Sequence, residues 1–556
     1  MRILTKSHYW IWFALLAAVV YIPFLGTVHL FDWDEINFAE IAREMIVTGD
    51  YLQVQVNYLP FWEKPPLFMW MQALAMNVFG VGEFGARFPN AICGIVTLLV
   101  LLNMGEKLID VKFGLIWALA YLGSILPHLY FRSGIIDPWF NLFIFIGLYY
   151  FILFYWRKDK RPGIYLPLHQ NRYLLYSALF IGLAILTKGQ VAFMILCVVF
   201  FVYWVLQRFR MFISVRQFFL YSFMVFSIVL LWFGIETIVN GPWFIETFIE
   251  YQYRLFSTPD AGHGGFIGYH FVVLLIGCFP ISIFVLHEMF KPSLGADHQN
   301  DFRKWMLILF WVVLILFSIV KSKIVHYSSL AYFPMTFLGA LTIYYLVEFK
   351  RMMMGKWALG LLIFIGLVFS AAVIAVPIIG MNIDILIPLL EKDPFAVANL
   401  QADLSFSYWQ MMPGILLLAT LMVFMYLMIK MKTMAAFKVL FIGTALFITT
   451  TLWADIKKIE GISQEAAIRF FKGLEDKDCY VLTKGYRSYA HLFYSKKPPV
   501  ENELSYDEDW LFHGDIDKDV YLSTKITKVH EVEALGTFEK LYEENGFVFY
   551  KRSAEK

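Results

Sequence analysis

The sequence predicts a polytopic α-helical membrane protein with a small α/β domain at its C-terminal end. Of the 556 residues, 60% are hydrophobic and only 16% are charged, whereas an ordinary soluble domain carries about 25% charged residues. The charge is also unevenly spread. Residues 454–556 contain 36 charged side chains, and the much longer segment 1–453 contains only 54. We therefore divide the chain into a membrane domain, 1–453, and a soluble domain, 454–556.

Charge and cysteine content exclude some classes of function. The net charge is +2, and the chain lacks the extended basic tract of an electrostatic nucleic-acid binder, so we expect no nucleic-acid partner. The four cysteines are widely separated, at positions 93, 197, 278 and 479. They give neither a paired disulfide framework nor a zinc-binding spacing.

Thirteen apolar runs are long enough, or nearly so, to cross a bilayer. They fall at 9–30, 88–106, 113–131, 137–156, 173–187, 190–207, 217–239, 266–287, 305–320, 325–348, 357–380, 408–430 and 436–453. The first run is too long for a signal peptide and has no cleavage site, so we interpret it as an uncleaved transmembrane helix. The run Leu67–Phe79 is shorter and follows two prolines. It is more typical of a helix lying at the membrane interface.

The basic residues predict the orientation of these spans. With the N-terminus inside, the inner loops collect 21 Lys and Arg, including the run RKDKR at 157–161, and nine lie outside or near the outer helix ends. An odd number of spans then places the soluble domain on the extracytoplasmic side. Strand-like runs at 480–482, 520–522 and 547–550 alternate there with helix-compatible segments such as 464–474, which predicts an α/β fold.

Acidic residues gather in the first outer loop, 31–87. A generic acidic loop is merely solvated, but two features favour a site. Asp34 and Glu35 begin an amphipathic segment whose apolar side would seat a helix on the membrane surface. The sequence Glu63-Lys64-Pro-Pro then fixes a carboxylate and an ammonium group beside a rigid turn.

Several of these segments together resemble a known family. The segments are DWDEINFAEIAREM (32–45), GDYLQVQVNYLPFWEKPPLFMW (49–70), FGVGEFGARFPNAI (79–92), RSGIIDP (132–138), LAILTKGQ (183–190), AGHGGFIGYH (261–270) and FSIVKSKIVHYS (317–328). They are similar to bacterial glycosyltransferases of the GT-C fold that use lipid-linked sugars. The aminoarabinose transferases that modify lipid A resemble the chain most, and protein O-mannosyltransferases are more distant. The GT-C resemblance agrees with about 13 transmembrane helices and an outer soluble domain.

The resemblance implies roles for three acids. Asp34, with Glu35 beside it, looks like the catalytic carboxylate that accepts the proton of the acceptor hydroxyl as the anomeric carbon is attacked. Asp137 looks like the second acid of the family. An Asp-Pro pair also starts helices, and the two roles are compatible.

The resemblance also implies a site for the lipid phosphate. Lys64, Lys188, Lys321, Lys323 and Tyr327 look like its ligands, because a polyprenyl phosphate leaving group requires fixed cations. A lysine at a helix end also commonly extends to the interface without binding anything.

Glu63 and His263 look like the pair that holds a divalent metal, zinc above all, in the aminoarabinose transferases. Two ligands leave the four-coordinate shell of zinc incomplete, and a histidine in a glycine-rich loop is often only a loop residue. One departure from the family is Asn37, which stands where the aminoarabinose transferases carry an arginine.

We therefore expect an inverting glycosyltransferase that moves one sugar from undecaprenyl phosphate to lipid A or another envelope acceptor, a lipid, a glycan or a protein. The expected location is the bacterial inner membrane, with the active site on the periplasmic side. A transporter or flippase of a lipid-linked sugar is the alternative, although transporters place charges near the bilayer midplane and commonly show internal repeats. A sensor with an outer domain would not require the elaborate first loop.

Overall fold

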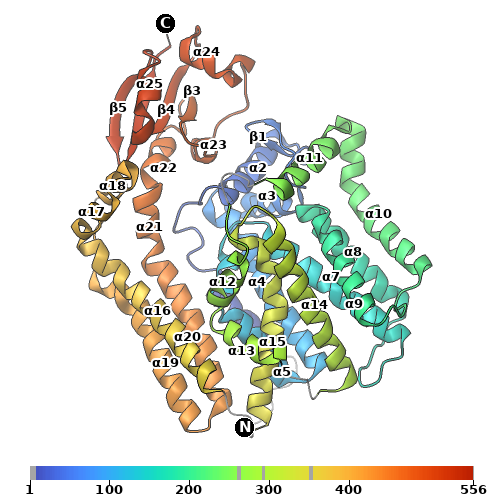
Figure 1. Ribbon diagram of the computed structural model, residues 1–556. Coiled ribbons are helices and arrows are strands. Elements are labelled where there is room, and N and C mark those ends of the chain that lie inside the picture. The colour runs from blue at the N-terminus through green and yellow to red at the C-terminus, as the bar shows by residue number, and fades with distance from the viewer. Residues whose placement is uncertain (1–7, 259–263, 291–294, 350–354, 403, 555–556) are drawn as a thin grey trace.

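The computed structural model describes residues 8–258, 264–290, 295–349, 355–402 and 404–554. A bundle of helices forms most of the chain, and the soluble domain lies at one end of it, opposite the N-terminus (Figure 1). The predicted fold class, a helical membrane domain joined to a small α/β domain, is confirmed. The predicted boundary between 453 and 454 falls at the end of α20.

The membrane domain consists of long helices and two bent pairs. Its helices are α1 (His8–Tyr21), α4 (Glu83–Leu108), α5 (Val111–Leu122), α6 (Ile125–Leu129), α7 (Asp137–Lys158), α8 (Gln170–Lys188), α9 (Val191–Leu206), α10 (Val215–Asn240), α11 (Trp243–Ser257), α12 (Tyr269–Gly277), α13 (Ile281–Phe290), α14 (Asp297–Ile319), α15 (Tyr332–Glu348), α16 (Lys356–Met381), α17 (Ile387–Leu390), α18 (Pro394–Leu400), α19 (Met412–Ile429) and α20 (Thr433–Ala454). The 3₁₀ segments η1 (Tyr130–Arg132) and η3 (Val325–Ala331) precede α7 and α15.

The number of spans differs from the prediction. Among the described residues, eight helices are long and apolar enough to cross a membrane, or ten if each bent pair forms one span. The pairs bend by 80° between α5 and α6 and by 118° between α12 and α13. The predicted runs 9–30 and 190–207 correspond to α1 and α9, whose 14 and 16 residues fall short of the roughly 20 needed to span a bilayer. A count of 13 therefore stays a prediction.

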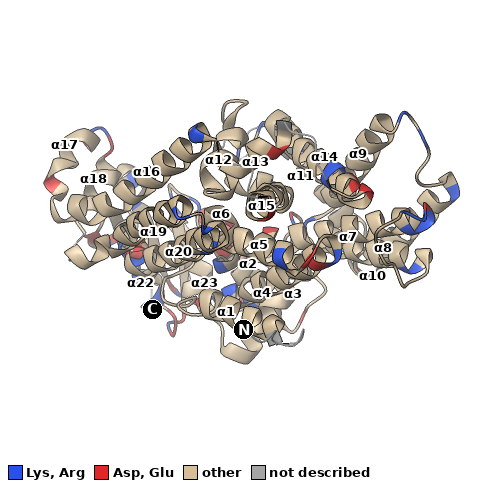
Figure 2. Ribbon diagram, turned by 90° about the horizontal axis from the view of Figure 1, so that it is seen from below, with Lys and Arg blue, Asp and Glu red and all other residues tan. Residues whose placement is uncertain are grey.

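Basic side chains mark the end of the bundle away from the soluble domain. Figure 2 views this end and shows Lys and Arg on loops and helix ends around α8, α9 and α14. The predicted inner run at 157–161 connects α7 to α8.

The first outer loop folds into two helices joined by a short hairpin. They are α2 (Asp34–Thr48), the antiparallel strands β1 (Gln55–Val56) and β2 (Leu59–Pro60), and α3 (Leu67–Phe79). Helix α2 begins at the residue that the sequence predicts, and α3 has the predicted bounds. The apolar side of α2 does not lie on a surface, however. Ile36, Ala39 and Ala42 are buried in a core cluster with Ala73 of α3 and Phe471 of the soluble domain.

The soluble domain is a four-stranded sheet with short helices. Its elements are α21 (Ile456–Ser463), α22 (Glu465–Lys472), β3 (Cys479–Lys484), α23 (Ala490–Tyr494), α24 (Glu508–His513), β4 (Asp519–Lys525), α25 (Val529–Glu533), β5 (Glu539–Glu544) and β6 (Phe547–Arg552). The strand order is β3-β4-β6-β5, with β3 parallel to β4 and the other two pairs antiparallel. Three strands match the predicted runs, and β5 was not predicted because its sequence, EKLYEE, is largely charged.

Candidate active site

A cavity of about 1370 Å³ lies between the membrane helices, the first outer loop and the soluble domain. Its wall is mainly apolar, which suits a lipid chain. The charged groups that line it come from distant parts of the chain: Asp32, Asp34, Glu35, Glu63, Lys64, Arg87, Arg132, Asp137, Lys188, Arg254, His326 and Arg487. Most residues that the sequence predicts as catalytic or phosphate-binding therefore face one space.

Two predicted catalytic acids meet in this cavity. Asp34 is the first residue of α2 and Asp137 the first of α7. His326, on η3, lies between them, with its Nε2 atom 3.7 Å from Oδ2 of Asp34 and 4.0 Å from Oδ2 of Asp137. The Asp34 side chain is 32% exposed and that of Asp137 only 3%. Asp34 is thus the acid that a substrate can reach.

Lys188 neutralises the buried acid. Its Nζ atom lies 2.6 Å from Oδ1 of Asp137 and 5.4 Å from the centre of the Tyr327 ring. Lys188 ends α8, and the chain turns immediately at Gly189, whose φ of +105° is in the region that favours glycine. This tight turn holds the ammonium group at the helix end, beside Asp137.

Two cations share one tyrosine on another wall of the cavity. Lys64 Nζ lies 3.3 Å from the Tyr251 hydroxyl and 4.7 Å from its ring centre, and Arg254 Cζ lies 5.2 Å from the same ring centre. Neither Lys64 nor Arg254 has a carboxylate partner in the part of the chain that the structure describes. Cations without a fixed counter-charge, facing a cavity, suit a phosphate group.

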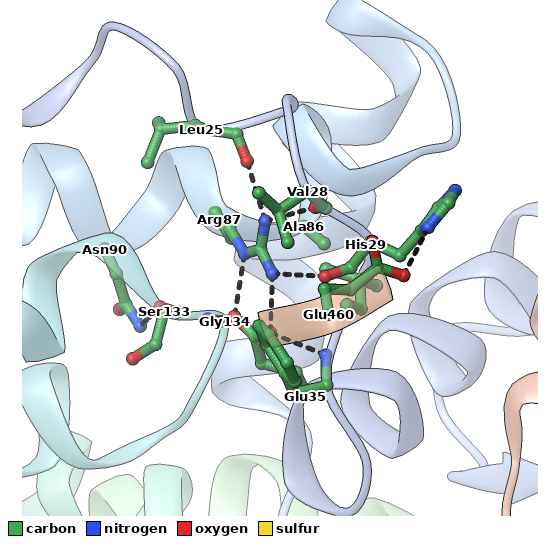
Figure 3. Close-up of polar contacts among 12 residues, drawn as sticks. Leu25, Val28, His29, Glu35, Ala86, Arg87, Asn90, Ser133, Gly134 and Glu460 are labelled. Carbon is green, nitrogen blue, oxygen red and sulfur yellow. Dashed lines mark hydrogen bonds and ion pairs between the residues drawn. The ribbon is translucent and has the colours of Figure 1, made fainter. Parts of the chain in front are cut away.

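Glu35 has a different environment from Asp34 (Figure 3). Its two oxygens accept hydrogen bonds from Nε and Nη2 of Arg87, both at 2.8 Å. They also accept hydrogen bonds from the backbone N–H groups of Phe31 and Gly134. Burial by itself raises the pKa of Glu35, but the charge and hydrogen bonds of Arg87, with those two N–H groups, outweigh burial and lower it. Glu35 thus positions the loop, and its oxygens already hold protein donors.

Two predicted phosphate ligands do not line the cavity. Lys323 donates from Nζ to the carbonyl oxygens of Phe317, Ser318 and Val320, and so caps the end of α14. Lys321 is exposed on the same connection. In contrast, Lys64, Lys188 and Tyr327 all face the cavity.

The predicted pair of metal ligands lies only partly within the described residues. Glu63 lines the cavity, and His263 lies outside the described residues. No group of three or more His, Cys, Asp or Glu side chains that could hold a metal ion is found within the described ranges. Since zinc takes four ligands, these residues do not supply its coordination shell.

The soluble domain holds the segment next to Asp34. Ser488 and the Tyr489 backbone N–H donate hydrogen bonds to the Asp32 carboxylate, and the Trp33 and Tyr489 rings lie 4.9 Å apart. Arg487, between these anchors and the sheet, faces the cavity. The domain therefore forms part of the wall of the site.

Sequence reasoning missed His326, Arg254 and Arg87 as parts of the site. His326 stands beside Tyr327 in a segment that the resemblance already covers, so its position was available. Arg254 lies in the amphipathic segment Trp243–Ser257, and the polar side of that segment could have indicated it. Arg87 was visible only as one more charge in the first outer loop.

The sequence of the chain is similar to those of known glycosyltransferases. Residues 63–232 match the family described as "Dolichyl-phosphate-mannose-protein mannosyltransferase". The undecaprenyl phosphate-alpha-4-amino-4-deoxy-L-arabinose arabinosyl transferase of Shewanella sediminis is 25% identical over 56% of this chain and 55% of its own length. The enzyme of that name from Edwardsiella ictaluri is 27% identical over 60% and 58%. The chain thus spans somewhat more than half the length of these curated relatives.

Solved structures show the same arrangement over nearly the whole chain. ArnT from Cupriavidus metallidurans bound to undecaprenyl phosphate has a TM-score of 0.77 at 17% identity, with 98% of both chains covered. The Archaeoglobus fulgidus oligosaccharyltransferase has a TM-score of 0.54 at 12% identity, over 99% of this chain and 75% of that one. The chain is therefore a multi-pass membrane protein with the GT-C fold of ArnT, and its sequence resembles the aminoarabinose transferases.

Proposed function

We propose that the protein is an inverting glycosyltransferase that moves one sugar from a polyprenyl phosphate, such as undecaprenyl phosphate, to lipid A or another lipid or glycan of the envelope. The site would face the periplasm at the bacterial inner membrane. One observation carries the proposal: a partly exposed carboxylate, Asp34, faces the same apolar-walled cavity as Lys64 and Arg254, two cations without carboxylate partners among the described residues. The names of the similar proteins agree with it.

The two cations account for the leaving group. When the bond from the anomeric carbon to the phosphate oxygen breaks, its electron pair stays on the phosphate, which gains negative charge. Lys64 and Arg254 meet that charge, so the phosphate does not require protonation. Because the phosphate is already charged in the bound donor, the same cations also contribute to donor binding.

Asp34 accounts for the nucleophile. Its carboxylate takes the proton of the acceptor hydroxyl while the acceptor oxygen bonds to the anomeric carbon on the side opposite the departing phosphate. One such displacement inverts the configuration at that carbon. Asp137, buried and paired with Lys188, contributes fixed charge beside the site.

We also propose that Glu63 and His263 bind a divalent metal, zinc above all. No step of the mechanism is assigned to the metal. Glu63 and His263 would hold the ion, which would supply positive charge when bound. Since Glu63 alone of the pair lies among the described residues, every step above is assigned to side chains of the protein.

The experiment is sugar transfer by the purified protein in lipid nanodiscs, with an undecaprenyl phosphate-linked sugar as donor. Lipid, glycan and protein acceptors are tested in separate arms, and mass spectrometry detects the product. The protein arm is included because the matched family model describes a protein mannosyltransferase.

Two substitutions separate the proposed roles. Asp34→Asn keeps the shape of the side chain but removes the base, so transfer should fall by about 10²–10⁴-fold while undecaprenyl phosphate still binds. Lys64→Ala and Arg254→Ala should weaken both binding and transfer. Lys540→Ala, an exposed position in the soluble domain, is the control. Near-normal transfer by Asp34→Asn would contradict the mechanism, and no transfer to any acceptor by the unmodified protein would contradict the function.

A further inference from the structure

His326 is the residue that connects the two acids of the site. Its Nε2 atom lies within 4.0 Å of one oxygen of each, Oδ2 of Asp34 and Oδ2 of Asp137. Oδ1 of Asp137 is already paired with Lys188, whereas Oδ2 is buried and has no hydrogen-bond donor among the described residues. A buried carboxylate oxygen without a donor is costly, and the imidazole is the polar group that faces it.

The groups around the imidazole come from several elements. Its charged neighbours are Asp34 on α2, Lys64 before α3, Asp137 on α7 and Lys188 on α8. Tyr327 packs edge-on at 5.3 Å, and His270 of α12 bonds through Nδ1 to Ser328 on the same 3₁₀ segment. The two lysines and two acids balance in charge, so protonation of His326 adds one net positive charge to the site.

We propose that His326 is a positioning residue that sets the basicity of Asp34. In its neutral form, with hydrogen on Nε2, it donates toward the carboxylates and holds one oxygen of Asp34, leaving the other for the acceptor hydroxyl. In its protonated form it places a full positive charge next to Asp34. This inference rests on the proposed transferase function and concerns the same site.

The direction of the pH effect follows from the charge. A positive charge about 4 Å away stabilises the ionised carboxylate and lowers its affinity for a proton, and a weaker base removes the proton of the acceptor hydroxyl more slowly. Transfer should therefore decline on the acid side as His326 becomes protonated.

The test is the pH profile of kcat/KM for transfer between pH 5 and 8. His326→Gln retains an N–H donor of similar reach but cannot become charged. With an imidazolium form that transfers no sugar, the activity of the unmodified protein should fall to about one tenth of its plateau one pH unit below the histidine midpoint, and a slower imidazolium form gives a smaller loss. His326→Gln should lose less than about twofold there. His530→Gln, which removes an exposed histidine of the soluble domain, should keep the unmodified profile. Any titration of donor or acceptor is common to all three proteins.

A second variant makes the test independent of His326→Gln folding. Asp137→Asn removes a negative charge that favours the imidazolium, so its acid-side decline should move to lower pH. The inference is overturned if His326→Gln keeps the acid-side decline, or if Asp137→Asn leaves the decline at the same pH. If the unmodified protein transfers no sugar at any pH, it is the proposed function that fails.

Discussion

The buried ion pair between Glu35 and Arg87 offers a direct test of how the first outer loop is held. Both residues are only 5% exposed. Arg87 also donates to the carbonyl oxygens of Leu25, Val28 and His29, at 2.7–2.9 Å (Figure 3). The pair thus joins the connection between α1 and α2, the start of α2 and the N-terminal part of α4. Its removal should loosen the segment that carries Asp34.

The expected cost follows from what each substitution leaves behind. Arg87→Met leaves a buried carboxylate and three carbonyl oxygens without their hydrogen-bond donor. Loss of one partner of a buried ion pair lowers the free energy of unfolding by about 3–5 kcal/mol. Adding Glu35→Gln in the same chain removes the uncompensated charge, so the double variant should recover part of that loss. Because the folded-state pKa of Glu35 is lowered, the pair should contribute fully above the ordinary carboxyl pKa of 4.5 and be lost as pH falls through the lower folded value.

Thermal unfolding in detergent, followed across pH 3–8, measures these effects. The matched control is Arg469→Met, because Arg469 pairs with Glu544 at 3.1 Å while 59% exposed. Such a surface pair contributes about 0–1 kcal/mol. The reasoning is refuted if Arg87→Met melts as the control does, or if Glu35→Gln destabilises the Arg87→Met protein further.

Two other predictions concern topology and the joint between the domains. Lys158 and Asp507 are both exposed, but the predicted orientation places them on opposite sides of the membrane. A cysteine at Asp507 should therefore react with an impermeant thiol reagent in spheroplasts, and one at Lys158 should not. Labelling at Lys158 alone, or at both positions, would contradict the orientation. Burial, together with nearby Glu40, raises the pKa of Glu44 to about 9. A carboxyl group whose pKa is raised by folding stabilises the fold at low pH, and this contribution is lost as pH rises through about 9. Relative to the base-catalysed exchange of an unfolded peptide, the amides at 57–58, whose N–H groups donate to Glu44, should therefore lose protection as pH rises through about 9, and Glu44→Gln should remove that loss of protection.

The sequence predicted elements well where a local signal was strong. Helix α3 has the predicted bounds, and α2 begins at Asp34, because prolines and an acidic first turn mark helix starts. The number of spans was harder to predict. Apolar composition identifies the run at 113–131, but the 80° bend within it depends on tertiary packing that hydropathy does not report.

The site shows the same division between local and long-range information. The positions of Asp34, Lys64 and Asp137 at one cavity agree with a resemblance whose motifs are contiguous. The roles of Glu35 and Lys323 do not follow from it, because the partner of Glu35 lies 52 residues away at Arg87, and Lys323 bends back onto carbonyl oxygens of α14. Adjacent charges such as Asp34 and Glu35 look equivalent in a sequence. They differ in the structure because successive residues of a helix point in different directions. Both line the cavity, but the Glu35 oxygens are paired with Arg87, whereas the Asp34 side chain is 32% exposed.

The burial of α2 also explains why the soluble domain lies where it does. A helix with carboxylates at its start and apolar residues along one side could rest on the membrane, where its depth would vary with the lipid. Here the Tyr494 hydroxyl of the soluble domain accepts a hydrogen bond from the Leu30 N–H. Arg43 of α2 donates to the carbonyl oxygen of Lys497, and Asp32 accepts from Ser488. These contacts lie before, at and beyond the start of α2, so the position of Asp34 is fixed by protein on both sides rather than by the bilayer. A base that must meet a hydroxyl group within hydrogen-bond distance requires that kind of support.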